Sequence, residues 1–88
     1  MKTFDVEIRP KRNTKKKTVK IGVWEFEEYA NSTVWILDAE NKAAAISLAK
    51  EIVSGMTLNE MNNALNLPKS ENDTAANPAA YTYKATVY

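Results

Sequence analysis

The only side chains in this sequence that are concentrated enough to suggest chemistry are carboxylates. Glu25, Glu27 and Glu28 fall within four residues, and Asp38 and Glu40 follow further along the chain. Carboxylates can ligate Mg²⁺, and a pair of them can act as acid and base in glycoside hydrolysis. The 88 residues contain no His, no Cys and only two Gly, which removes the usual general base, a thiolate nucleophile and a glycine-rich phosphate loop. We therefore predict no catalytic centre, no metal site and no cofactor.

Two aromatic residues, Trp24 and Phe26, are interleaved with these glutamates. Charge that orients a partner and rings that bury area are both features of protein interfaces. One interpretation is therefore a protein-binding surface made of Trp24, Glu25, Phe26, Glu27 and Glu28. The other is structural, because aromatic residues at alternating strand positions commonly lie in the core, where Trp24 and Trp35 would then be found.

Basic residues are concentrated near the N-terminus, although the net charge is only +1. Residues 1–20 hold eight Lys and Arg against two acids, whereas residues 21–88 hold four against nine. Residues 10–17 contain no apolar side chain and are expected to form an exposed hairpin loop. The candidate phosphate-binding residues are Lys11, Arg12, Lys15, Lys16, Lys17 and Lys20. They predict, as the alternative function, a nucleic-acid-binding module in which exposed aromatics stack on bases; a solvated loop explains the same charges.

The strongest hydrophobic pattern lies in residues 33–55, where a strand leads directly into a helix. The continuous apolar run from Val34 to Leu37 predicts a central strand. Spacing of i, i+3, i+4 and i+7 then predicts a helix with an apolar stripe of Ala45, Leu48, Ala49 and Ile52. Asn41 is the expected N-cap, and Gly55 is expected just after the helix in a left-handed conformation.

Two strands are predicted before this unit. Phe4, Val6 and Ile8 alternate with polar residues until Pro10 ends the first strand. The second starts at Thr18, and its apolar phase shifts near Gly22, which we interpret as a β-bulge rather than a strand whose two ends bury opposite faces. Residues 29–32 form a turn, so that this second strand pairs antiparallel with the strand at 33–37.

A second helix and a last strand complete the chain. Thr57 and Glu60 match a capping box, and Met56 and Met61 match a hydrophobic staple, with Pro68 ending the helix. Residues 69–80 are polar and predict a loop that is partly disordered, before an alternating strand at 81–88 that pairs beside either the first or the third strand. The expected fold is a single α+β domain over residues 1–88, with a four-stranded, mainly antiparallel sheet in the order β-β-β-α-α-β and two helices packed on one face.

Two resemblances bear on function. Residues 57–70 resemble the second helix and turn of a helix-turn-helix unit, with Thr57, Glu60, Ala64, Leu65, Leu67 and Pro68 at the matching positions. The recognition helix that should follow is missing, because residues 71–80 are aperiodic and include Pro78. Over residues 2–52, the pattern of strands followed by the helix segment DAENKAAA resembles small phage-encoded α/β proteins, anti-CRISPR proteins among them. This second resemblance implies a non-enzymatic interaction protein that binds and modulates a host protein or complex through a sheet face or edge.

The sequence contains neither a signal-peptide pattern nor a membrane-span pattern, and this bears on the location of the protein. The N-terminal residues follow a strand pattern instead of the apolar core of a signal peptide, and no apolar run reaches the length of a membrane span. We expect a cytoplasmic protein, in the host cytoplasm if it is phage-encoded, without a membrane partner. The final strand is an exposed edge that would suit either a monomer or a homodimer.

Overall fold

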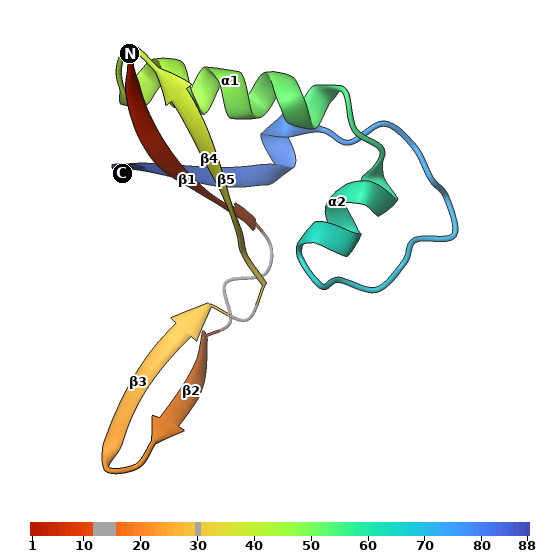
Figure 1. Cartoon of the computed structure of the whole chain (residues 1–88). Helices are drawn as coiled ribbons and strands as arrows, with labels where there is room; N and C mark the ends of the chain where they lie inside the picture. The colour runs from red at the N-terminus through yellow and green to blue at the C-terminus, as the bar shows by residue number, and fades with distance from the viewer. Residues whose placement is uncertain (12–15, 30) are drawn as a thin grey trace.

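The computed structural model describes residues 1–11, 16–29 and 31–88 and confirms an α+β fold (Figure 1). Its elements in chain order are β1 (Lys2–Pro10), β2 (Lys16–Ile21), β3 (Trp24–Tyr29), β4 (Thr33–Ala39), α1 (Lys42–Ser54), α2 (Leu58–Ala64), the 3₁₀ helix η1 (Pro78–Ala80) and β5 (Tyr81–Val87). The described strands form two antiparallel sheets, a three-stranded one in the order β4-β1-β5 and the hairpin β2-β3. The expected single sheet of four strands is therefore divided into three strands plus a separate hairpin.

The hairpin corrects the interpretation of the second predicted strand. Gly22 has a φ of +61°, while Val23 is not among the described residues with positive φ, a combination that fits a two-residue type II′ turn. The apolar phase shift near Gly22 therefore marks a chain reversal and not a bulge. As a result, β2 pairs with β3, and the predicted pairing of this segment with residues 33–37 is wrong.

The centre of the main sheet is β1, not the apolar run at residues 34–37. Val6 of β1 lies opposite Trp35 of β4 on one side and opposite Ala85 of β5 on the other. This pairing resolves the position of the last strand, which lies beside the first. The strand β4 is an edge whose side chains alternate, with Trp35 packed on the core and Val34 and Ile36 exposed on the opposite face. The sequence predicted a central strand covered on at least one face; β4 does have one covered face, but it is an edge strand and the central position is wrong.

The core lies between that covered face and the helices. Phe4, Val6 and Ile8 of β1 are fully buried, as the alternation predicts. The helix α1 lies against all three strands, and its buried stripe of Ala45, Ala49 and Val53 is small enough for a close approach. Met61 and Leu65 of α2 complete the same buried cluster.

Local capping signals account for both helix starts. The Oδ1 atom of Asn41 accepts a hydrogen bond from the Ala44 amide at 2.8 Å, and the capping box is complete, with Thr57 N to Glu60 Oε1 at 3.0 Å and Glu60 N to Thr57 Oγ1 at 3.2 Å. The left-handed conformation expected at Gly55 is wrong. Gly55 has a φ of −90° because its amide continues to donate to the Ile52 carbonyl, so the helix ends in a tight turn.

Backbone and side-chain hydrogen bonds hold the polar segment at residues 69–80. The Asn59 carboxamide forms two hydrogen bonds with the Ser70 backbone: its Nδ2 donates to the Ser70 carbonyl at 3.1 Å, and its Oδ1 accepts from the Ser70 amide at 2.8 Å. The side chain thus bonds to Ser70 as a backbone peptide group would. The Leu58 amide donates to the Thr74 carbonyl at 2.7 Å, and the Ala76 amide donates to the Met56 carbonyl at 2.9 Å. This segment thereby brings η1 and the start of β5 opposite α2.

Candidate interaction surfaces

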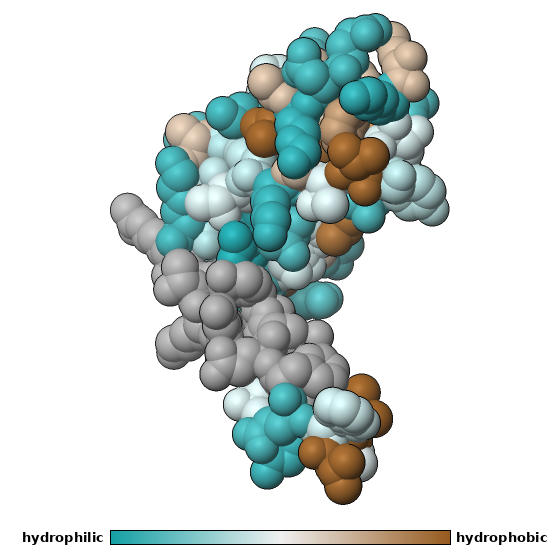
Figure 2. Space-filling model, turned by 90° about the vertical axis from the view of Figure 1, so that its left-hand side faces the viewer, coloured by the Kyte–Doolittle hydropathy of each residue, from teal (hydrophilic) through white to brown (hydrophobic). Residues whose placement is uncertain are grey.

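The hairpin β2-β3 projects from the rest of the molecule (Figure 1). Hydrophobic side chains are exposed at its end (Figure 2). We call Ile21, Gly22, Val23 and Trp24 the hairpin tip. The exposed fractions are 62% for Ile21, 96% for Val23 and 74% for Trp24. Trp24 is therefore not a core residue, whereas Trp35 does pack against the core. The difference arises because, within the described residues, no helix or other sheet packs against the hairpin turn.

Strand pairing places the two charged sets of the hairpin opposite each other. In the backbone register, Lys20 faces Glu25 and Lys17 faces Glu28. The three lysines of β2 and the three glutamates of β3 give the hairpin strands no net charge. Opposite charges at cross-strand positions attract each other, which weakens both as separate docking surfaces. The side chains of Lys16, Lys17 and residues 26–29 lie outside the described part of the structure, as do Arg12 and Lys15 altogether.

The basic segment at residues 10–17 joins two sheets. The prediction that it closes a hairpin between neighbouring strands is wrong, because the neighbours of β1 are β4 and β5. Its first residue after β1, Lys11, has an exposed side chain, and its amide donates to the Ala80 carbonyl at 3.0 Å. Of the six candidate phosphate-binding residues, the structure thus describes exposed side chains for Lys11 and Lys20 only. Lys11 follows β1 of the main sheet, whereas Lys20 lies in β2 of the hairpin.

The uncovered face of the main sheet is a second surface, which the sequence analysis missed. Val34 and Ile36 are 51% and 59% exposed there, opposite Glu7 and Asp5 of β1 in the register. Val34, Asp5 and Glu7, together with Lys84 and Thr86 of β5, border a shallow hollow of about 240 Å³. The sequence holds no signal for this face, because residues 34–37 are all apolar and only the structure shows that their burial alternates.

The carboxylates considered for catalysis are divided between two sheets, with Glu25, Glu27 and Glu28 in β3 and Asp38 in β4. Asp38 accepts a hydrogen bond from the Thr3 hydroxyl at 2.7 Å, and Glu7 forms an ion pair with Arg9 at 3.1 Å. Within residues 1–11, 16–29 and 31–88, no three His, Cys, Asp or Glu side chains are grouped so that they could hold a metal ion.

Comparison with known proteins adds no family to this picture. No protein-family model, curated protein or solved structure matches the chain. The resemblance to small phage-encoded proteins therefore stays a prediction. In the described part of the chain, none of the helices is both long enough and apolar enough to span a membrane.

Proposed function

We propose that this protein is a non-enzymatic interaction module that contacts a partner protein with its hairpin tip. The observation that supports this proposal most directly is the exposure of Ile21, Val23 and Trp24 within four residues at the end of a projecting hairpin. These side chains contribute nothing to the buried core. Contiguous exposed apolar groups commonly mark protein contact sites, and Trp is among the residues enriched at binding hot spots.

The size of this contact follows from the area that Trp24 leaves open. With 74% of the residue exposed, an indole residue of roughly 250 Å² presents about 185 Å² to a partner, which corresponds to at most about 4–5 kcal/mol of apolar transfer free energy. Association entropy and side-chain ordering offset much of such a gain. The hairpin tip is therefore best suited to act as an anchor within a larger contact, with Lys20 and Glu25 at its rim.

A capture experiment with matched variants tests this proposal. The purified wild-type protein, Trp24→Thr and Ile36→Thr are each immobilised and exposed to nuclease-treated cell extract. Both substitutions place a strand-compatible residue at an exposed position, but only the first alters the hairpin tip. We expect Trp24→Thr to lose a protein that both others retain. Equal recovery by all three would reject the hairpin tip as the contact.

The alternative function, nucleic-acid binding, requires an affinity that falls as the salt concentration rises. Each phosphate contact adds a slope of roughly 0.7–0.9 to the dependence of log affinity on log salt. Titrating labelled single-stranded and double-stranded DNA and RNA with the wild type and with Lys15→Ala, Lys16→Ala, Lys17→Ala combined measures that slope. Binding that weakens with salt and depends on these lysines would favour the alternative, and absence of binding at low salt would remove it.

A further inference from the structure

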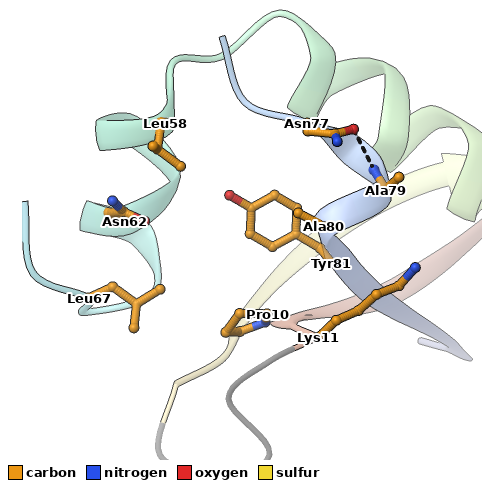
Figure 3. Close-up of a pocket in the computed structure, with 9 residues that line it drawn as sticks. All are labelled: Pro10, Lys11, Leu58, Asn62, Leu67, Asn77, Ala79, Ala80 and Tyr81. Carbon is orange, nitrogen blue, oxygen red and sulfur yellow. Dashed lines mark hydrogen bonds between the residues drawn. The ribbon is translucent and has the colours of Figure 1, made fainter. Parts of the chain in front are cut away.

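A pocket of about 480 Å³ lies where α2 faces the end of the main sheet (Figure 3). Its walls come from the end of β1, from α2 and the turn after it, from η1 and from the first residue of β5. These elements are distant in sequence and meet through the hydrogen bonds that hold residues 69–80. The volume is within the range of sites that hold small molecules.

The most informative side chain in this pocket is Tyr81. The residue is only 5% exposed, and its hydroxyl points from β5 toward α2 (Figure 3). That hydroxyl makes no hydrogen bond to any residue that the structure describes. Among the described residues, no side-chain polar atom is both fully buried and without a partner, so the hydroxyl is accessible, and it is accessible from the pocket that Tyr81 lines. Burial raises the pKa of Tyr81 above its usual value of 10.0, so the group is a neutral phenol able both to donate and to accept.

Apolar walls flank this hydroxyl. Leu58 lies on the same face of α2 as Met61 and Leu65, at i, i+3 and i+7. Met61 and Leu65 are fully buried, but Leu58 is only half-buried because the pocket lies beside it. Leu67, in the turn after α2, is half-buried in the same way. An occupant of the pocket would therefore remove leucine surface from water, which is favourable in proportion to the area covered.

The pocket also discriminates against charge. Asn62, half-buried on the α2 wall, has a carboxamide without a hydrogen-bond partner among the described residues. Among the described residues that line the pocket, none is acidic, and the ammonium group of Lys11 points away from α2 (Figure 3). A cationic ligand would give up hydration without meeting a negative charge among the described lining residues. An anionic ligand would meet only the exposed ammonium group of Lys11, whose charge is screened by solvent, whereas a neutral polar group finds two groups that can donate and accept.

We propose that this pocket binds a neutral, largely apolar ring that carries one hydrogen-bonding group. The ring covers Leu58 and Leu67, and its polar group pairs with the Tyr81 hydroxyl and the Asn62 carboxamide. Indole and phenol rings have this chemistry, whether free in solution or carried as Trp and Tyr side chains on a peptide. The proposal does not depend on the hairpin tip, which lies on the other sheet.

Titration of the ¹⁵N-labelled full chain, followed by amide chemical shifts, tests the proposal with four probes. Indole and phenol are the free rings, N-acetyl-tryptophanamide carries the ring on a peptide unit, and toluene lacks the hydrogen-bonding group. We expect saturable shifts for indole and phenol at the amides of Leu58, Asn62, Leu67 and Tyr81, and weaker binding of toluene. Tighter binding of N-acetyl-tryptophanamide than of indole assigns the site to a peptide side chain, and the reverse order assigns it to a free molecule.

Two tyrosine variants supply the matched comparison. Tyr81→Phe keeps the ring and removes only the unpaired hydroxyl, so we expect it to fold and to lower indole affinity about five- to tenfold, the value of one hydrogen bond. Tyr83→Phe removes a hydroxyl that is bonded to Pro78, on a residue outside the pocket, and should leave indole affinity unchanged. Unsaturable shifts, shifts at other amides, equal affinity for toluene or an unchanged affinity in Tyr81→Phe would each overturn the proposal.

Discussion

Removing the hydroxyl oxygen should lower stability at one of two tyrosines on β5 and leave it nearly unchanged at the other. The Tyr83 hydroxyl donates to the Pro78 carbonyl at 2.8 Å in a partly buried position and thereby ties η1 to the strand. The Tyr81 hydroxyl has no partner among the described residues. Replacing each residue with Phe keeps the ring, including the ring of Tyr83 that lies 5.6 Å from the Lys50 ammonium.

The expected magnitude for Tyr83→Phe is that of one neutral hydrogen bond. Such a bond contributes roughly 0.5–1.5 kcal/mol net. The Pro78 carbonyl also accepts the Tyr81 amide, so it keeps one partner after the substitution, which places the expected loss in the lower half of that range. In a domain of this size, 1 kcal/mol corresponds to roughly 4–8 °C in Tm. For Tyr81→Phe we expect a change in the free energy of unfolding within about 0.5 kcal/mol.

Urea unfolding followed by far-ultraviolet circular dichroism measures both variants against the wild type at neutral pH. Equal slopes would allow the midpoints to be converted directly into free-energy differences. A loss in Tyr81→Phe as large as that in Tyr83→Phe would show that the Tyr81 hydroxyl has a partner in solution. The reasoning for the pocket would then fail together with this prediction. An unchanged midpoint in Tyr83→Phe would refute the proposed role of the bond to Pro78.

Three further predictions concern α2 and pH. Thr57→Ala removes the capping box and should lower the free energy of unfolding by about 1 kcal/mol in urea titrations. Glu60→Gln keeps the side-chain acceptor and should lower it by less, so equal losses in the two variants would contradict the role of the capping box. Met61→Ala should cost about 2–5 kcal/mol because the side chain is fully buried, and a loss below 1 kcal/mol would mean that α2 does not pack as described. Burial raises the pKa of Tyr81; burial and, second, the charge of Tyr81 raise the pKa of Tyr83. Folding therefore favours the neutral form of both phenols, and the stability that this provides is complete below the unfolded pKa of 10.0 and is lost as pH rises through the folded pKa values. Urea midpoints between pH 8 and 11 should therefore fall more steeply for the wild type than for the double Phe variant, and parallel curves would refute the assignment.

Features that depend on a few neighbouring residues could be predicted from the sequence. The capping box of Thr57 and Glu60 and the N-cap of Asn41 are formed within one helical turn, so nothing distant can alter them. The alternation of Phe4, Val6 and Ile8 likewise identified a strand with one buried face. These local signals were sufficient for the α+β class.

Features that depend on which segments meet could not be predicted in the same way. Gly22 and a shift of apolar phase occur both in a bulge and in a hairpin turn, and only the partner of the following segment distinguishes the two. The exposure of Trp24 follows from the same pairing, because it places the ring on a hairpin outside the main sheet, where no described helix packs against it. The pocket at Tyr81 was missed for a related reason, since its lining residues are contributed by segments far apart in the sequence.

The sequence by itself determined which reactive side chains are present and which local structures form. It contains no His or Cys, it has a basic segment followed by an acidic remainder, and its helices and strands begin at recognisable local signals. Tertiary structure decided how these parts combine. Pairing β2 with β3 set Lys20 opposite Glu25, and packing of the helices on the other face of the main sheet left Val34 and Ile36 exposed. The physical reason is that side-chain periodicity specifies which face of an element is apolar, whereas the exposure of that face depends on contacts with distant segments.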